Sequence, residues 1–318
     1  MTAAVAVAVV STNQRDLLAR ALRSLEPEQQ AGRIEAWVVD NASEDGSAEM
    51  VRSEFPWVEL IALEENVGYG RAVNLAAERA GGEWVAPANE DIELRPGAIE
   101  LLLAAAERHP EAAVLAPRLV QADGSTQHSV FAFPTLGLAL AVNLGIARAT
   151  RRLGDRLCIE GLWDPDRPRE VPWAIATFFL CRREAFDAIG GFDPEQFIHA
   201  EDLDLEWRLQ RTGWRVRYVP DAEVFHVGSA ATKHAFGEDL MPRYLAASYA
   251  WMLRRRGAFV ARSIALVSVT GSGVRAVLFG ALAAAGLRRF RAPRDAARAW
   301  TRAHAVGLRP RGSLMRRR

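Results

Sequence analysis

The first 120 residues alternate short apolar runs with longer amphipathic segments, and this alternation limits the folds that the chain can adopt. An apolar run followed by a segment with helical spacing is typical of a βαβ unit, in which successive strands lie parallel. The pattern therefore predicts an α/β fold with a mainly parallel sheet flanked by helices. The expected strands are 5–10, 36–39, 58–63 and 84–88, and the expected helices are 15–25, 47–55, 70–80 and 96–108.

The second part of the chain is less regular. Residues 125–170 follow no clear period, and Pro165 and Pro168 indicate a loop. A regular pattern returns over 171–181, and the segments 183–189 and 201–211 have helical spacing. A further strand is expected at 214–219.

Charge is distributed unevenly along the chain, although the formal net charge is only +1. The segment from Arg254 to the end holds 16 arginines and one acid, Asp295. Residues 1–253 hold 24 basic and 38 acidic residues, a balance of −14 against +15 in the C-terminal segment. The chain therefore combines an acidic body with a basic tail.

The cysteines and the N-terminus indicate the compartment. The two cysteines, Cys158 and Cys181, have no spacing typical of a metal site or of a disulfide framework, so a reducing cytoplasm is expected. The apolar residues 3–10 lack the basic segment that begins a signal peptide. We interpret them as a buried first strand.

Residues 244–290 are apolar and helical in pattern but are interrupted by arginines. Two runs of 12 residues, 263–274 and 276–287, are separated by Arg275. Each is shorter than the roughly 20 apolar residues that a membrane-spanning helix needs. We expect a basic amphipathic helical tail on an anionic membrane surface, with packing against the rest of the protein as the alternative.

Two acidic clusters about 110 residues apart are the strongest candidates for chemistry. The first, Asn89-Glu90-Asp91, follows an expected strand, where an open α/β sheet collects charged groups around a ligand. Mg²⁺ and Mn²⁺ take one or two carboxylates together with phosphate oxygens, so this cluster is a candidate metal site. An acidic surface turn is the alternative interpretation.

The second cluster, Glu201-Asp202, begins an expected helix. A helix N-terminus favours a negative charge by about 0.3–1 kcal/mol, so such an acid stays ionised at neutral pH and can take a proton from an attacking hydroxyl. A helix-capping acid is the alternative. His226 is a candidate further metal ligand as a neutral imidazole, although a lone histidine is more often structural.

Other polar residues follow expected strands and are candidates for binding a nucleotide. Asp40, at the end of the second strand, can accept a hydrogen bond from the N3–H group of a pyrimidine. The glycines of 66–74 precede a helix but do not form the dinucleotide-binding fingerprint. A turn with a helix cap and an arginine on a solvated face are the alternatives for these segments. The candidates are Thr12, Asn13, Asp40, Asn41, Ser43, Asn66, Gly68, Arg71, Asn74 and Asn89.

Taken together, these segments resemble family 2 of the inverting GT-A glycosyltransferases. Their order and spacing over residues 5–232 are similar to the rhamnosyltransferase-like branch. The matching segments are 9–13, 38–47, 66–74, 89–91, 190–193, 201–202 and 226–228.

The resemblance implies a role for each matching residue. Asp40 would bind the pyrimidine, and Asp91 would coordinate a divalent cation, Mg²⁺ or Mn²⁺, with His226 beside it. Asp202 would be the catalytic base, with Glu201 next to it. The sequence departs from the family pattern at Asn89, which begins the acidic motif, and at Ala176-Thr177, where a Gly-Ala pair is usual before the acceptor site.

The resemblance also implies a GT-A catalytic domain over 1–243 and the tail over 244–318. Residues 1–120 would be the nucleotide-sugar-binding half and 121–243 the acceptor and catalytic half. The expected reaction is inverting transfer of rhamnose from dTDP-rhamnose, or of galactofuranose or a hexose from UDP, to a hydroxyl in cell-envelope glycan synthesis. The expected partners are a nucleotide diphosphate sugar, a glycan or lipid-linked acceptor and an anionic membrane surface, with no nucleic acid. The expected location is the inner face of the cell membrane.

Two other functions compete with this one. A sugar-phosphate nucleotidyltransferase would carry a glycine-rich N-terminal phosphate loop with a lysine, and this chain has neither. A non-catalytic membrane-bound scaffold with a GT-A fold is supported only by Asn89 at the first position of the acidic motif. The presence of Asp91, Asp202 and His226 together argues against a scaffold.

Overall fold

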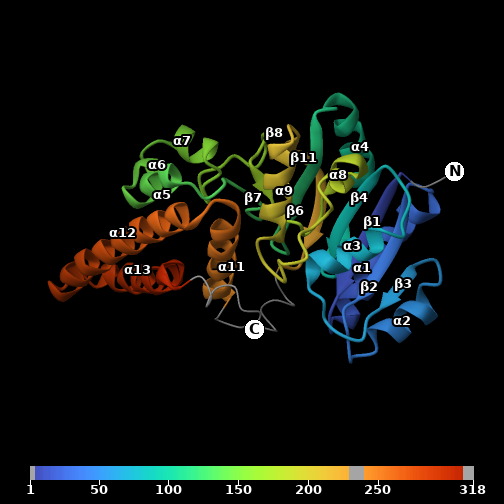
Figure 1. The fold of residues 1–318 in the computed structure, drawn as a ribbon, viewed down its shortest axis with the longest axis horizontal. Helices are drawn as coiled ribbons and strands as arrows, with labels where there is room; N and C mark the ends of the chain where they lie inside the picture. Colours follow the sequence, from blue (N-terminus) through green and yellow to red (C-terminus); the bar gives the residue numbers. More distant parts are fainter. Residues whose placement is uncertain (1–3, 229–239, 311–318) are drawn as a thin grey trace. The chain divides into compact units, whose positions relative to one another are not determined.

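The computed structural model describes residues 4–228 and 240–310. The contacts within it divide the chain into two compact units (Figure 1). The sheet unit contains residues 4–131 and 164–228 of the described chain, and the helical unit contains 132–163 and 240–310. Four of the 16 arginines of the basic tail, Arg311 and Arg316 to Arg318, lie outside the described residues. The predicted domain limits at 120/121 and 243/244 stay predictions.

The sheet unit is built on a mixed sheet of nine described strands, in the order β3-β2-β1-β4-β10-β6-β11-β5, with β8 paired to β11. The strands β3, β2, β1 and β4 are mutually parallel, as the alternating pattern predicted. A separate pair is formed by β7 (Val130–Phe131) and β9 (Trp173–Ala174). The main strands are β1 (Val5–Ser11), β2 (Ile34–Asp40), β3 (Glu59–Ala62), β4 (Trp84–Asn89), β5 (Ile92–Leu94), β6 (Ala112–Val120), β8 (Arg169–Glu170), β10 (Leu180–Arg182) and β11 (Arg215–His226).

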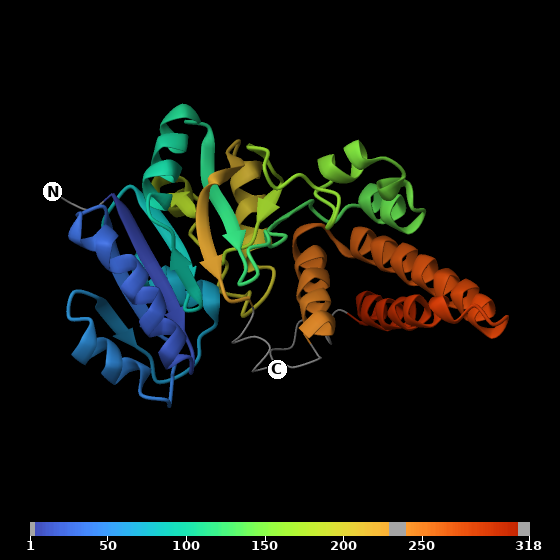
Figure 2. The same cartoon turned by 180° about the vertical axis from the view of Figure 1, so that it is seen from behind.

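Helices cover both faces of this sheet. α1 lies in front of the strands in Figure 2, whereas α3 lies in front of them in Figure 1. Covering on both faces explains why every residue of β1 is buried and why its sequence is a continuous apolar run. The helices of this unit are α1 (Arg15–Gln30), α2 (Ser47–Glu54), α3 (Tyr69–Ala77), α4 (Ala98–Arg108), α8 (Arg183–Ala188) and α9 (Glu201–Arg211). The α/β fold with a mainly parallel sheet is therefore confirmed.

The register of the parallel strands brings distant segments together. Ser11 at the end of β1 pairs with Asp40 at the end of β2, and Val10 pairs with Asn89 at the end of β4. Asp40 in turn pairs with Ala62 at the end of β3. Four strand ends therefore share one edge of the sheet, and the candidate polar residues follow them. The expected regular run over 171–181 is different in the structure, where it is divided into the short strands β9 and β10.

The helical unit combines two stretches of chain that are far apart in the sequence. Residues 132–163, which follow no clear period, form three short helices, and residues 240–310 form three longer ones. Short 3-10 helices at Arg288–Phe290 and Ala305–Leu308 flank the last of these. The helices are α5 (Leu136–Asn143), α6 (Ile146–Ala149), α7 (Arg151–Arg156), α11 (Leu240–Arg255), α12 (Ala258–Ala284) and α13 (Arg291–His304).

The expectation of two short apolar helical runs was wrong. The first run and residues 276–284 of the second lie in α12, a single helix of 27 residues that is long and apolar enough by length and composition to cross a membrane. The helix continues through Arg275 because arginine is a good helix former, and its charged side chain is hydrogen-bonded within the unit. Its two terminal nitrogens donate to the backbone carbonyl and to the side-chain oxygen of Asn143, both at 3.0 Å. Helix length therefore does not exclude a membrane span.

Candidate active site

The loops that follow β1 and β2 are joined by hydrogen bonds around Asp40. The backbone N–H of Asn13 donates to the Ser43 hydroxyl at 2.9 Å, and the Asn13 side chain accepts from the backbone N–H of Glu44 at 2.7 Å. Asp40 is 3% exposed, and one of its carboxylate oxygens accepts from the N–H of Ser43 at 3.4 Å. The other oxygen has no hydrogen-bond partner in the described part of the chain. Asp40 can therefore accept a hydrogen bond from a ligand.

A second set of bonds shapes the loop between β3 and α3. The Asn41 side chain donates to the Asn66 side chain at 2.9 Å and accepts from the N–H of Val67 at 2.8 Å. Gly68 has φ of +84°, and a Cβ atom there would lie 2.2 Å from the carbonyl oxygen of Phe197. A glycine is thus required where this loop meets the segment before α9.

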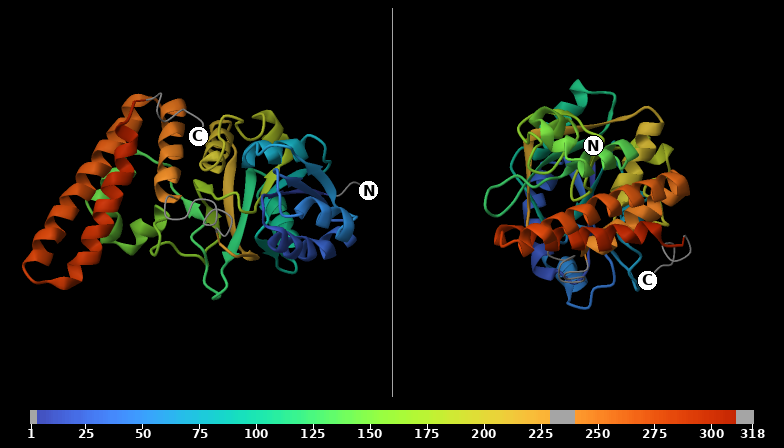
Figure 3. Two further views of the ribbon diagram at one scale, coloured as in Figure 1. Left: turned by 90° about the horizontal axis from the view of Figure 1, so that it is seen from below. Right: turned by 90° about the vertical axis from the view of Figure 1, so that its left-hand side faces the viewer.

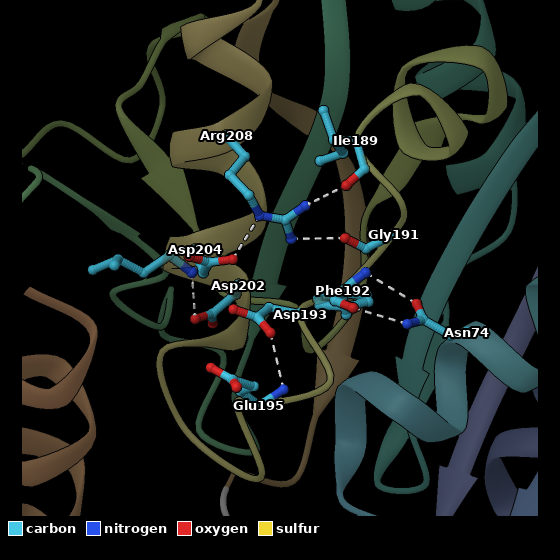
Figure 4. Close-up of polar contacts among 10 residues, drawn as sticks. Asn74, Ile189, Gly191, Phe192, Asp193, Glu195, Asp202, Asp204 and Arg208 are labelled. Atoms are coloured by element: carbon cyan, nitrogen blue, oxygen red, sulfur yellow. Dashed lines mark hydrogen bonds and ion pairs between the residues drawn. The ribbon is translucent and has the colours of Figure 1, made fainter. Parts of the chain in front are cut away.

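The other two candidates on α3 differ in their surroundings. Arg71 lies in the first turn of α3 and is exposed, so its guanidinium is accessible to an anionic ligand. The Asn74 side chain donates to the carbonyl of Phe192 at 2.8 Å and accepts from its N–H at 2.9 Å (Figure 4). This reciprocal pair gives Asn74 a structural role, and its predicted role in donor binding stays a prediction.

The acidic motif forms the tight turn between β4 and β5. The N–H of Asn89 donates to the carbonyl of Thr177 at 3.0 Å, so the motif is attached to the Ala176-Thr177 segment. Burial raises the pKa of Glu90 to about 8, although the Thr12 N–H donates to its carboxylate. Glu90 is therefore mostly protonated at neutral pH. Asp91 is left as the carboxylate of this turn that can neutralise a cation.

Asp91 and His226, which the family resemblance assigned to one metal site, are in contact. The carboxylate Oδ1 of Asp91 is 3.2 Å from Nε2 of His226, and the two residues are 4% and 3% exposed. The strand β11, which ends at His226, pairs with β5, which begins directly after Asp91. The sheet pairing thus brings together two residues separated by 135 positions in the sequence.

The proton on His226 is positioned by Gln127. The side-chain oxygen of Gln127 lies 2.6 Å from Nδ1 of His226, and because that oxygen only accepts, Nδ1 carries the hydrogen. If the ring is neutral, Nε2 presents a lone pair to the Asp91 carboxylate, and a cation bound to both atoms would stabilise this pair of acceptors. Hydrogen bonding at one ring nitrogen is the usual way a protein orients a metal-binding histidine.

These residues therefore fit Mg²⁺ or Mn²⁺. The described residues contain no group of three or more His, Cys, Asp and Glu side chains suited to a metal, so Asp91 and His226 would hold the ion together with other oxygen ligands. A site with few protein ligands is typical of a cation that binds together with substrate phosphates.

Asp202, the predicted general base, accepts two backbone hydrogen bonds. Its two carboxylate oxygens accept from the N–H of Leu203 at 2.7 Å and from the N–H of Ala176 at 3.3 Å. Burial raises the pKa of both Asp202 and Glu201, and the Asp202 charge raises the pKa of Glu201 further. Glu201 has an oxygen with no partner among the described residues, whereas both oxygens of Asp202 accept backbone hydrogen bonds. Glu201 therefore holds the proton, and Asp202 is the anion.

Tyr69 links the two acidic clusters, and the sequence analysis missed it. Its hydroxyl donates to the carbonyl of Ala176 at 2.5 Å. Burial and the nearby acids Glu201, Glu90, Asp202 and Asp91 raise the pKa of Tyr69 well above its usual value. The Ala176-Thr177 segment joins the two clusters, because the N–H of Ala176 donates to Asp202 and the carbonyl of Thr177 accepts from the N–H of Asn89.

Hydrogen bonds from Arg208 connect α9 to the glycine-rich segment 189–191 that precedes it (Figure 4). Its Nε donates to the Asp204 carboxylate at 2.6 Å, and its terminal nitrogens donate to the carbonyls of Ile189 and Gly191 at 2.8 and 2.7 Å. The side chain of Asp193 accepts from the N–H of Glu195 at 2.9 Å and stabilises the turn that follows. The helix that carries Asp202 is therefore held in a fixed position relative to this segment.

Replacing Arg208 with methionine is expected to destabilise the protein by about 3–5 kcal/mol, because the fully buried Asp204 would lose its counterion. Urea titration followed by tryptophan fluorescence would measure the change. Arg52→Met is the matched control, since Arg52 pairs with Glu49 on the surface, where an ion pair contributes about 0–1 kcal/mol. An Arg208 variant as stable as the control would mean that the ion pair does not hold α9.

Family models match most of the chain. A model described as Glycosyl transferase family 2 matches residues 6–190, and one described as Glycosyl transferase family group 2 matches residues 166–299. An N-acetylglucosaminyl-diphospho-decaprenol L-rhamnosyltransferase from Mycobacterium tuberculosis is 35% identical over 207 residues. The match covers 61% of this chain and 66% of that relative. The rhamnosyltransferase WbbL of Escherichia coli is 30% identical over 86 residues, which are 27% of this chain and 32% of WbbL.

Solved structures show the same fold at low identity. The mannosyltransferase PcManGT from Pyrobaculum calidifontis, in complex with GDP-Man and Mn²⁺, superposes with a TM-score of 0.58 at 18% identity. The superposition covers 97% of this chain and 86% of PcManGT. GalNAc-T7 with UDP, GalNAc and Mn²⁺ superposes with a TM-score of 0.54 at 16% identity, over 80% of this chain and 50% of GalNAc-T7.

Proposed function

Because the chain belongs to glycosyltransferase family 2 and has the GT-A fold, we propose that it is an inverting rhamnosyltransferase. It transfers rhamnose from dTDP-rhamnose to a hydroxyl of a lipid-linked or polysaccharide acceptor in cell-envelope glycan synthesis. The rhamnosyltransferases from Mycobacterium tuberculosis and Escherichia coli support rhamnose as the sugar. The name of the mycobacterial relative includes a diphospho-decaprenol, which supports a lipid-linked acceptor. The observation that carries the proposal is that the Ala176-Thr177 segment joins Asp202 to the turn that holds Asp91, whose carboxylate lies 3.2 Å from His226.

The donor binds at the shared edge of β1, β2 and β4. The free carboxylate oxygen of Asp40 accepts the N3–H of thymine, and Arg71 lies exposed at the start of α3 for a phosphate. Asp91 and the Nε2 atom of His226 hold a divalent cation, with Gln127 fixing the ring. When bound, the cation supplies positive charge that offsets the charge developing on the leaving diphosphate.

Asp202 performs the proton transfer. It takes the proton of the acceptor hydroxyl while that oxygen forms a bond to the anomeric carbon of rhamnose. The bond between the anomeric carbon and the diphosphate oxygen breaks on the opposite face, and the bond electrons leave with dTDP, so the configuration inverts. Glu201, being protonated, leaves Asp202 as the anion of the pair.

A transfer assay tests this function. The full-length protein would be incubated with Mn²⁺, a GlcNAc-diphospho-polyprenol acceptor and radiolabelled dTDP-rhamnose, UDP-galactofuranose or UDP-galactose. The expected result is label in the lipid phase from dTDP-rhamnose alone, which disappears when EDTA is added. Transfer only from a UDP-sugar would replace the proposed donor, and no transfer from any donor would favour a non-catalytic scaffold.

The helical unit supports a second part of the proposal, a peripheral position on the cytoplasmic face of the membrane. Five large apolar side chains on α12 are exposed and follow one face of the helix at helical spacing. We call them the α12 stripe. They are Phe259 (82% exposed), Leu266 (59%), Val274 (62%), Val277 (75%) and Leu278 (54%).

A peripheral position is favoured over a membrane span by the neighbour of α12. Helix α13 runs beside α12 (Figure 3) and carries Arg291, Arg294, Arg298 and Arg302. If α12 crossed the bilayer, these charges would enter the hydrocarbon, where each is strongly unfavourable. In the interface the stripe is buried among acyl chains while the arginines contact anionic headgroups.

We expect the protein to float with anionic liposomes at low salt and much less with neutral ones. Each basic residue near the surface contributes about 1 kcal/mol, an effect screened over about 8 Å in physiological salt. Changing Val274, Val277 and Leu278 together to serine should weaken the flotation, whereas Leu101→Ser, at an exposed leucine of the sheet unit, should not. Equal binding to both kinds of liposome, or unchanged binding of the triple variant, would contradict the proposed attachment.

A further inference from the structure

The helical unit contains a cavity of about 750 Å³ between α5, α12 and α13. Its walls are mainly apolar side chains, with Leu138 and Val142 from α5, Ile264 and Phe279 from α12, and Trp300 from α13. The volume is within the range of about 300–1,000 Å³ that is typical of small-molecule sites. It belongs entirely to this unit and is separate in the sequence from the residues of the proposed donor site.

Close packing and hydrogen bonds between α5 and α12 form one wall of the cavity. A Cβ atom at Gly271 would lie 2.4 Å from the side-chain oxygen of Asn143, so only glycine lets the two helices approach this closely. Arg275 then bonds the same asparagine with two hydrogen bonds of 3.0 Å. On the opposite wall the Trp300 ring is stacked on His304, with centroids 5.5 Å apart.

The charges that line the cavity have one sign. Arg148 and Arg275 line it, and none of the described lining residues is acidic. Burial and the charge of Arg275 lower the pKa of His304 to about 4, so the imidazole is neutral at physiological pH. Its Nδ1 is 2.9 Å from the hydroxyl of Tyr249. The cavity therefore combines an apolar interior with positive charge and complements a ligand that has a hydrocarbon chain and an anionic group.

We propose that this cavity binds the isoprenoid chain of a diphosphate-linked acceptor lipid, with Arg148 and Arg275 near its phosphates. The inference rests on the proposed function, because a transferase acting on a water-soluble acceptor would not need a hydrocarbon site. The mainly apolar lining favours a hydrocarbon chain over a nucleotide or a sugar, because many polar groups of those ligands would lose hydrogen bonds to water there. The absence of acids among the described lining residues favours an anionic lipid over a neutral or cationic one.

Titration calorimetry of the full-length protein in EDTA, without detergent, tests the site directly. The probes are farnesyl diphosphate, inorganic diphosphate and dodecyl phosphate. Farnesyl diphosphate is expected to bind at least about tenfold more tightly than the other two, because it alone offers both the branched chain and the diphosphate. Equal or tighter binding of dodecyl phosphate would identify a site for an acyl lipid and overturn the proposal.

Variants of residues that line the cavity test whether farnesyl diphosphate binds there. Ala297→Phe, which fills the cavity from α13, should weaken farnesyl diphosphate binding at least about tenfold and raise the KM for the lipid acceptor, with the KM for dTDP-rhamnose unchanged. Ala296→Phe, at the exposed rim, is a second filling variant if the first does not fold. Ala299→Phe, on an exposed position of the same helix, is the matched control. Arg148→Gln should weaken binding of farnesyl diphosphate more than binding of farnesol.

The outcomes separate this inference from the proposed function. Sugar transfer with wild-type acceptor KM in both filling variants would overturn the cavity site and leave the function standing. Binding of farnesyl diphosphate that Ala297→Phe abolishes, without sugar transfer from any donor, would support the site and contradict the function. No binding of farnesyl diphosphate by the wild-type protein would overturn the site.

Discussion

Replacing Asp202 with asparagine is expected to lower turnover at least about a hundredfold while leaving the affinity for dTDP nearly unchanged. A positioned general base contributes about 10²–10⁴-fold to a rate, and asparagine keeps the shape of the side chain while removing its basicity. Steady-state kinetics of rhamnose transfer and calorimetry with dTDP would measure the two quantities. Asp187→Asn is the matched control, because this carboxylate is largely exposed on α8. Near-normal turnover of the Asp202 variant would mean that Asp202 acts only as a helix-capping acid and is not the general base.

The same residue should govern the acid side of the pH profile. A general base acts when deprotonated, so kcat/KM falls as the pH drops through the pKa of Asp202. Because burial raises that pKa, the fall should begin at a higher pH than for an exposed aspartate, whose pKa is about 3.9. The residual activity of Asp202→Asn should lack this acidic limb.

Replacing Asp91 with alanine is expected to abolish the metal-dependent part of donor binding. The change removes the anionic ligand and leaves His226 alone with its partner Gln127. Asn89→Ala should weaken binding only modestly, because an amide oxygen is a weaker ligand than a carboxylate. Calorimetry with dTDP, in the presence and absence of Mn²⁺, would measure both effects.

Asp221→Ala provides the comparison for this experiment, since Asp221 is exposed on β11, the strand that ends at His226. It should bind dTDP and Mn²⁺ as the wild-type protein does. An Asp91 variant that still required Mn²⁺ for tight donor binding would place the cation elsewhere.

The sequence alone was sufficient to predict the first half of the fold. Strands β1 to β4 and helices α1 to α4 are recognisable because each follows a regular local pattern of apolar residues, and parallel strand ends necessarily share an edge. Because β1 and β2 are parallel neighbours, Asp40 at the end of β2 lies close to the loop that follows β1. The predicted pairing of Asp91 with His226 depended on a family resemblance, because the antiparallel pairing of β5 with β11 has no local signal.

The remaining features depend on contacts that no local pattern encodes. Gln127 lies in a segment without a clear period, and Tyr69 looks like an ordinary first residue of a helix. Arg275 appeared to interrupt an apolar helix because its partner, Asn143, is 132 positions away. In each case a polar side chain is explained by a partner from a distant segment.

The helical unit is built from two stretches that are far apart in the sequence, and this affects folding during synthesis on the ribosome. Helix α5 leaves the ribosome well before α12, which ends at Ala284, about 140 residues after Asn143. At roughly 5–20 residues per second, α5 waits about 7–28 s for its partner. During that interval the future walls of the cavity at Leu138 and Val142 lack the helices that will face them. Premature termination before residue 284 therefore releases a chain in which the apolar helix α5 has no partner, and such a chain is a target for chaperones and proteases.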